Sequence, residues 1–261
     1  MTETAVLCAA RDGAMWITLN RPAAMNSITP AIVQGIEAAL VEALADPQVS
    51  AVVLTGTGRA FCAGADLKYV REQTQGDESA TAAFLQTVLR LMNRLETFPK
   101  PVIAAINGLA LAGGLELVLC CDLAFAADDA RFATPGVNIG LWCITPMVAL
   151  SRAVSRKHAM QMLLTGRLFD AQHAFRIGLV NEVVAEAQLD QAVRETALEI
   201  ASKSTFTVAL GKQSFYRQAD MGLSDAYEYA SELVVRNLMA EDAVEGISAF
   251  VEKRTPVWKG R

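Results

Sequence analysis

The stretch LAGGLELVL at residues 111–119 places two glycines and one carboxylate, Glu116, in a run that is otherwise apolar. It follows VIAAI at 102–106, an apolar run that predicts a buried strand. Small residues just after the strand favour a tight turn and let a ligand approach the main chain closely. We therefore expect a strand, a turn and then a helix that carries Glu116 in its first turn.

Outward from this stretch, strand and helix patterns alternate along the chain. A hairpin is predicted at 5–19, and Thr29 followed by Pro30 predicts the start of a helix that reaches about Asp46. Helical periodicity returns at 79–98 and again after Asp170, a candidate cap. Strands are predicted at 50–54, 102–106, 123–127 and 180–184. This alternation predicts an α/β fold with a largely parallel, buried sheet, and the recurring strand, glycine bend and helix suggest an internal structural repeat.

After Glu186 the strand patterns stop, and helical segments continue almost to Lys253. We therefore divide the chain into a core at residues 1–200 and a helical region at residues 201–261 that packs on the core or on another subunit. No linker of low complexity separates the two parts.

Composition narrows the class of protein. The chain has 261 residues, 52% of them hydrophobic, and a net charge of -5 with scattered Lys and Arg, so we expect no nucleic-acid partner. The first residues lack the basic start and long apolar stretch of a secretion signal, which predicts a cytoplasmic protein. The uncharged run 132–151 contains prolines and glycines, which favour buried loop and turn over a membrane span.

Cysteine and histidine usage gives no sign of a disulfide framework or a metal site. The five cysteines include no Cys-x-x-Cys pair, and there are only two histidines. We expect Cys8, Cys120, Cys121 and Cys143 to be small core residues. We also expect no metal.

Two stretches carry the pattern of a catalytic site. FCAGADLK at 61–68 and NGLALAGGLE at 107–116 both follow predicted strands and are rich in small residues. If the two exits lie side by side, each aims a backbone amide at one point, and such a pair forms an oxyanion hole for a carbonyl oxygen that gains negative charge. The amides expected to do this are those of Cys62 and Gly113, the latter at a helix start. Dinucleotide, P-loop and nucleophile-elbow motifs are absent from the sequence.

Glu116 has two interpretations from its position. Three residues after Gly113 and in an apolar setting, its carboxyl group would have a raised pKa, which suits proton transfer beside an enolate. Alternatively, it is a structural carboxylate that pairs with a group such as Arg131 or caps the helix. A nucleophilic role for Cys62 is disfavoured, because no histidine base lies near it in the sequence.

Taken together, FCAGADLK, PVIAAINGLALAGGLEL and CDLAFA closely resemble the enoyl-CoA hydratase/isomerase (crotonase) superfamily. The resemblance extends from NRPAAMNS at 20–27 to SAFVEKR at 248–254. It implies a crotonase-type spiral of ββα units with a C-terminal helical trimerisation region, assembled as a homotrimer or a dimer of trimers. It also implies an acyl-CoA thioester as ligand, with coenzyme A as part of the substrate and no separate cofactor.

The resemblance also implies roles for individual residues. The thioester carbonyl would lie between the amides of Cys62 and Gly113, and Glu116 matches the first of the two glutamates that hydratases use. Arg59 would lie near the phosphates, and Trp142 would close the acyl pocket unless it is a core aromatic. The full set expected to contact CoA or substrate is Met25, Arg59, Ala63, Gly64, Ala65, Asp66, Leu67, Lys68, Gly114, Trp142, Phe250 and Lys253.

One departure from the family pattern concerns the second glutamate. Hydratases carry it after the proline of a Phe-x-x-Pro-Glu stretch, whereas this chain reads FATPG and has Gly136 there. The following run, through Trp142 and Cys143, is similar to the subgroup called enoyl-CoA hydratase domain-containing protein 3. Hydration uses two carboxylates, and glycine supplies none. The sequence therefore predicts enolate chemistry with Glu116 as the only acid/base, either isomerase-type or weakly hydrating.

Two alternatives stay open at this point. The protein could be a catalytically weak or silent acyl-CoA-binding protein that regulates a partner. Thioester hydrolysis and decarboxylation also remain open, because one fold supports several chemistries around one oxyanion hole.

Overall fold

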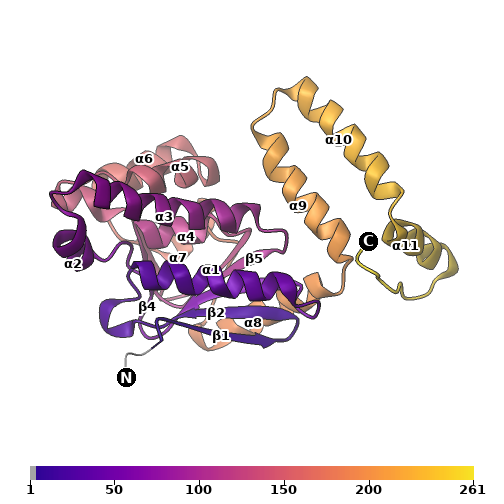
Figure 1. Ribbon diagram of the computed structural model, residues 1–261, viewed down its shortest axis with the longest axis horizontal. Coiled ribbons are helices and arrows are strands. Elements are labelled where there is room, and N and C mark those ends of the chain that lie inside the picture. The colour runs from indigo at the N-terminus through magenta and orange to yellow at the C-terminus, as the bar shows by residue number, and fades with distance from the viewer. Residues whose placement is uncertain (1–3) are drawn as a thin grey trace.

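Two sheets form the centre of the computed structural model, which describes residues 4–261 (Figure 1). The larger sheet has the order β1-β2-β3-β5-β7-β10, and the smaller sheet has the order β4-β6-β8-β9. The first pair, β1 and β2, is antiparallel, as are β8 and β9, and the other neighbours are parallel. The strands are β1 (Val6–Arg11), β2 (Ala14–Leu19), β3 (Ala51–Gly56), β4 (Ala60–Cys62), β5 (Val102–Ile106), β6 (Leu109–Leu111), β7 (Leu123–Ala127), β8 (Arg131–Ala133), β9 (Phe169–Asp170) and β10 (Glu182–Val184).

Successive strand pairs alternate between the two sheets. β3, β5 and β7 lie in the large sheet, and each is followed by a short strand, β4, β6 or β8, in the small sheet. A helical segment follows each pair: α2 (Leu67–Tyr69), a π-turn at Val70–Thr74 and α3 (Glu78–Thr97); then α4 (Gly113–Leu119); then α5 (Ile144–Ala153) and α6 (Arg156–Thr165). This is the spiral of ββα units that the family resemblance implies, and it confirms the internal repeat.

Polar side chains begin several helices, with Thr29 and Asp170 as predicted and Asp77 in addition. The hydroxyl of Thr29 accepts a hydrogen bond from the Ile32 amide at the start of α1 (Pro30–Ala45). Asp77 and Asp170 accept from backbone amides three residues on, at 2.9 and 2.7 Å, at the starts of α3 and α7 (Ala171–Arg176). Such caps satisfy amides that have no partner inside the helix. The short 3-10 segments are Pro22–Ala24, Pro135–Ile139 and Glu186–Gln188.

Both faces of the large sheet are covered by helices. Buried side chains of α1, α3 and α4 form the main cluster on one face, and α8 (Leu189–Ala201) covers the other face, where Val193 packs with Trp16 and Phe125. The last three helices, α9 (Thr205–Ala219), α10 (Leu223–Leu238) and α11 (Glu241–Glu252), extend away from the sheets (Figure 1). The helical character of the chain after Glu186 is thus confirmed, and the first of these helices, α8, packs on the core.

Two sequence expectations about buried segments are wrong. The run 132–151, expected to be buried loop and turn, contains most of α5 and exposes Leu141 and Ile144. Pro146 permits this helix because it stands in the first turn, where its missing amide hydrogen has no intrahelical acceptor to lose. Cys8, expected in the core, is exposed, because β1 is an edge strand whose residues after Val6 face outward. Among residues 4–261, no helix has the length and apolar character needed to cross a membrane.

Candidate active site

The exits of β4 and β6 lie side by side, because these strands pair in parallel. After β4 the chain is hydrogen-bonded to residues 25–28. The Ala63 amide donates to the Met25 carbonyl at 3.0 Å. The Ile28 amide donates to the Gly64 carbonyl, and the Asp66 amide donates to the Ile28 carbonyl. Ala65 lies opposite Ile28 in this parallel bridge, so its own amide points to the other side, towards α4. A Cβ built on Gly113 would lie 3.8 Å from the Ala65 nitrogen. The amides of Ala65 and Gly113 therefore belong to adjoining loops.

Unusual backbone conformations bring these loops together. Ala112, just before α4, has φ 46° and ψ -117°, a conformation that costs energy for a residue with a side chain and that clusters at functional sites. Gly64 has φ +89°, and a Cβ there would lie 2.9 Å from the Leu111 carbonyl and 3.2 Å from the Gly113 nitrogen. Only glycine at 64 allows the β4 exit to lie against the start of α4.

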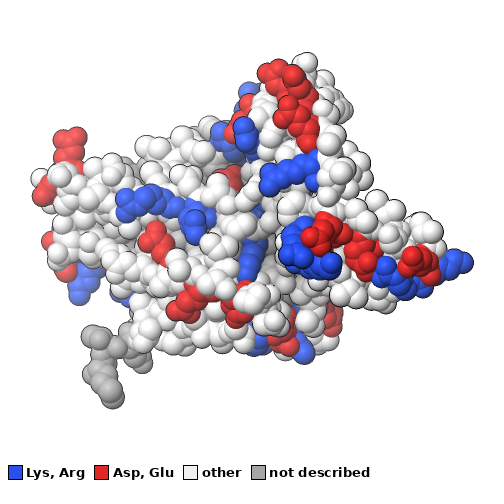
Figure 2. All heavy atoms as spheres, turned by 45° about the vertical axis from the view of Figure 1, so that its right-hand side comes forward, with Lys and Arg blue, Asp and Glu red and all other residues white. Residues whose placement is uncertain are grey.

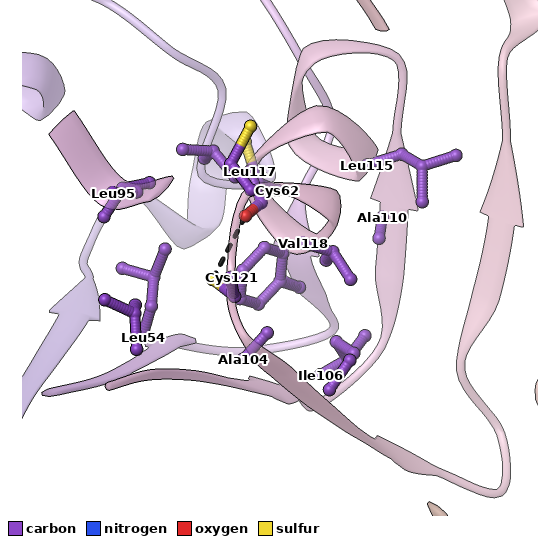
Figure 3. Packing of buried hydrophobic residues seen from close by; sticks show 14 of the residues in the cluster. Leu54, Cys62, Leu95, Ala104, Ile106, Ala110, Leu115, Leu117, Val118 and Cys121 are labelled. Atoms are coloured by element: carbon purple, nitrogen blue, oxygen red, sulfur yellow. Dashed lines mark hydrogen bonds between the residues drawn. The ribbon is translucent and has the colours of Figure 1, made fainter. Parts of the chain in front are cut away.

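Cys62 occupies a different place from the one expected for an oxyanion donor. It is the last residue of β4, lies opposite Ala110 of β6 and is completely buried. Figure 3 shows it among apolar residues of the core. Burial raises the pKa of its thiol to about 12, so the thiol is not a nucleophile at neutral pH. The geometry favours Ala65 over Cys62 as the residue whose amide accompanies that of Gly113.

Glu116 lies in α4 with a side chain that is 4% exposed. The hydroxyl of Thr145 donates a hydrogen bond to Oε2 at 2.8 Å. Burial raises the pKa of the Glu116 carboxyl to about 7, against the opposing effect of the Thr145 hydrogen bond. Arg131 instead donates to the carbonyls of Asp129 and Ala130, and no side chain caps α4. Glu116 therefore neither pairs with Arg131 nor caps α4, and its partner Thr145 was not expected from the sequence.

The space beside Gly136 is already filled. A Cβ at this position would lie 2.7 Å from the Leu141 carbonyl oxygen and 3.1 Å from the Cys143 sulfur. The Leu141 amide also donates to the Gly136 carbonyl at 2.9 Å, which fixes the loop over it. Cys143 is nearly buried, and its thiol pKa is raised by burial and by the nearby Glu116. A carbonyl and a thiol thus stand where the hydratase pattern carries a second carboxylate.

The candidate ligand-binding residues around β4 differ in what they offer a ligand. Arg59, Leu67 and Lys68 expose their side chains, whereas Met25, Ala63 and Ala65 are half-buried. Asp66 is occupied: it accepts from the amides of Lys68 and Tyr69 and from Arg21, and although burial raises the pKa of its carboxyl, these bonds bring it below the usual value.

Gly114 has a packing role that accounts for its small size. A Cβ on Gly114 would lie 2.0 Å from the Cys62 carbonyl oxygen, so glycine at this position lets α4 pack directly on β4. This contact sets the height of Glu116 above the small sheet. Gly114 is buried.

Three aromatic or basic candidates lie at or beyond the edge of the site. Trp142 is 37% exposed and donates its Nε1 hydrogen to the Met147 sulfur at 3.3 Å, so it is not a core aromatic. Phe250 is exposed on α11, and Lys253 follows directly after that helix. α11 packs against α9 and α10 and lies far from α2 and α4 (Figure 1). Within a single chain, Phe250 and Lys253 therefore do not lie near the other candidate residues.

The fold and the paired loops around Glu116 define a crotonase-type protein, and comparison with known proteins gives its family. The model of the enoyl-CoA hydratase/isomerase family matches residues 9–261. The chain belongs to this family.

Particular relatives point to one subgroup. The chain is 43% identical to enoyl-CoA hydratase domain-containing protein 3, mitochondrial, of Xenopus laevis, over 93% of this chain and 82% of that protein. The human protein of the same name is 42% identical over 95% of this chain and 81% of its own length. Its crystal structure superposes with a TM-score of 0.93 at 40% identity, covering 97% of this chain and 100% of that one. A Mycobacterium smegmatis enoyl-CoA hydratase also gives a TM-score of 0.93, at 41% identity and 98% and 99% coverage.

Proposed function

We propose that this protein binds an acyl-CoA thioester and catalyses proton transfer through an enolate, with Glu116 as the only carboxylate that takes part. The observation that carries this proposal is the carboxyl of Glu116, buried, with its pKa raised to about 7, in the first turn of the helix that begins with Gly113. The thioester oxygen would accept hydrogen bonds from the amides of Gly113 and Ala65, whose loops adjoin. Such donors stabilise the negative charge that develops on the oxygen.

The arrangement favours isomerisation over hydration. A carboxylate removes a proton from one carbon of the acyl chain, the enolate is held by the two amides, and the same carboxyl returns the proton to another carbon. Hydration requires a second group to hold and deprotonate water, and Gly136 leaves only the Leu141 carbonyl and the Cys143 thiol there. Arg59, just before β4, and Lys68, in α2, expose their side chains and suit the CoA phosphates.

A second candidate function is binding without turnover. The filled space beside Gly136 favours this function. Glycine in place of the second glutamate removes hydration, and the same replacement is expected in a protein that has lost catalysis. In that case, the loops of Gly113 and Ala65 would hold the thioester, and the protein would sequester ligand or regulate a partner.

Mass spectrometry of enoyl-CoA thioesters incubated in deuterated water separates these functions. We expect deuterium uptake or double-bond migration without the mass gain of one water, because one carboxylate is present. Hydration by the unaltered protein would contradict the isomerase-type proposal. No reaction across short and medium chains, with acyl-CoA raising the melting temperature, would favour the binding function. Gly136→Glu tests for restored hydration, and Gly136→Ala is its matched control because both add the Cβ that meets the Leu141 carbonyl.

We also propose that the C-terminal helices assemble the protein into a homotrimer or a dimer of trimers. A groove of ≈ 430 Å³ runs between α9 and α10, and apolar side chains on the last three helices are exposed. The groove is lined by Leu210, Phe215, Tyr229, Leu233 and Val234, among others. Contiguous exposed apolar surface of this kind marks protein interfaces.

Sedimentation equilibrium checks the assembly. We expect a mass of three or six times the 28.0 kDa chain, and a monomer would contradict the proposal. Val234→Glu is expected to shift the equilibrium towards monomer, since it places a charge in the groove. Val41→Glu, an equally exposed valine on α1, is the matched control and should leave the mass unchanged.

The location of the protein and its independence of nucleic acid stay predictions. The printed names of the Xenopus and human relatives carry the word mitochondrial. On the face drawn in Figure 2, acidic and basic side chains are interleaved, which fits a small-molecule ligand better than a polyanion.

A further inference from the structure

The two oxygens of the Glu116 carboxyl group have different surroundings. Oε2 accepts the hydrogen bond from the Thr145 hydroxyl at 2.8 Å. Within residues 4–261, Oε1 has no protein partner, yet it is not among the fully enclosed unpartnered side-chain atoms, which are Trp16 Nε1, Thr134 Oγ1 and His173 Nε2. One oxygen is therefore held by the protein, and the other opens on accessible space.

Thr145 is itself held firmly at the start of α5. The helix begins at Ile144, the Met147 amide donates to the Cys143 carbonyl at 3.0 Å, and Pro146 is buried. α5 packs directly against α4. The hydroxyl thus reaches Glu116 from a second helix, α5, which packs against α4.

We propose that Thr145 is a positioning residue that holds Glu116 Oε2, so that Oε1 is turned towards the thioester between the amides of Gly113 and Ala65. This inference rests on the proposed function, because positioning has a consequence only where Glu116 transfers a proton. A carboxyl group that moves one proton between two carbons must present the same oxygen in both steps, and a fixed rotamer supplies that.

The titratable groups that face Glu116 from the packed elements are thiols. They are Cys120 at the end of α4 and Cys143 before α5, whereas Cys62 on β4 lies against Gly114 of α4. Burial raises the pKa of all three, so they are neutral at pH 7. Thr145 alone among the described side chains stabilises the ionised carboxylate by a hydrogen bond, and its removal should raise the pKa of Glu116 further.

The test uses Thr145→Val, which keeps the shape of the side chain and removes the donor. We expect the midpoint of the Glu116 carboxyl infrared band, identified in the unliganded protein by difference from Glu116→Gln, to rise by about one pH unit. We also expect kcat at pH values above the midpoint to fall about tenfold, since a loose carboxylate is ionised but misplaced. Thr145→Ser should restore both values. Ser151→Ala is the matched control, because Ser151 lies on the same helix and bonds only the Val148 carbonyl.

An unchanged midpoint, or an unchanged kcat above the midpoint, would overturn the proposal. If Thr145→Val does not fold, Thr145→Ala and Thr145→Ser provide the same comparison. If the unaltered protein turns over no substrate while the midpoint still moves in Thr145→Val, the proposed function fails and the hold of Thr145 on Glu116 stands. The two failures are therefore distinguishable.

Discussion

Glu116→Gln is expected to lower turnover by about 10²–10⁴-fold while acyl-CoA still binds. The amide has the size of the carboxyl group and can accept the Thr145 hydrogen bond, but it cannot take up or release the proton. The measurement is deuterium exchange or isomerisation by mass spectrometry, with binding followed by calorimetry. Glu78→Gln is the matched control, since Glu78 also stands in the first turn of a helix, α3, but is exposed. Equal turnover by Glu116→Gln and the unaltered protein would remove Glu116 from the mechanism.

The pH dependence tells which form of Glu116 reacts first. With a pKa of about 7, the carboxyl is ionised above that pH. Abstraction of a carbon-bound proton begins from the ionised form, so kcat/KM should rise through about pH 7 to a plateau. A fall of kcat/KM above pH 7 would instead show that the reaction begins from the carboxylic acid, as in proton delivery to an enolate formed by addition.

The raised pKa of Glu116 should also make the stability of the protein depend on pH, in a direction that can be predicted. The pKa of Glu116 is higher in the folded protein than in the unfolded chain, so the unfolded chain loses this proton first as the pH rises. Its contribution to stability is full below the ordinary pKa near 4.5 and is lost as the pH rises through about 7. The melting temperature of Glu116→Gln minus that of the unaltered protein should therefore increase between pH 5 and pH 9. The same difference for Glu78→Gln should stay constant.

The regular part of the fold was predictable because local patterns agree with the final packing. Helix caps and strand periodicity depend on residues that are close in the sequence, so both are visible there. Examples are the caps Thr29 and Asp170 and the buried runs at 102–106 and 123–127. The alternation between two sheets was not visible, because β4, β6 and β8 have three residues each and no measurable period. Their pairing depends on contacts between turns of the spiral.

The candidate site divides in the same way. Gly113 and Glu116 share one helical turn, and their proximity follows from sequence spacing. Thr145 lies 29 residues from Glu116 on a helix that the prolines and glycines of its segment seemed to forbid. A threonine before proline in an apolar run was the signal available. The choice between Cys62 and Ala65 depends on where β4 ends, a boundary that the small residues of FCAGAD do not mark.

Lys212→Met should lower the free energy of unfolding by about 3 kcal/mol, because it leaves the Asp122 carboxylate nearly buried without its cation. Lys212 extends from α9 and donates to Asp122 Oδ2 at 2.6 Å and to the carbonyls of Leu95 and Lys100. Its side chain is only 6% exposed, against 16% for Asp122. Asp122 also accepts from Tyr216 of α9 and from the Val102 amide of β5, and burial together with Asp122 raises the pKa of the Tyr216 hydroxyl.

Urea unfolding at one fixed protein concentration measures the loss, since assembly makes apparent stability concentration-dependent. Lys259→Met is the matched control: its partner Glu241 is exposed, and such pairs contribute about 1 kcal/mol or less. Combining Lys212→Met with Asp122→Asn should recover part of the loss, because the unpaired charge is then gone. A loss in Lys212→Met no larger than in Lys259→Met would mean that apolar contacts, rather than this ion pair, hold α9 to the sheet.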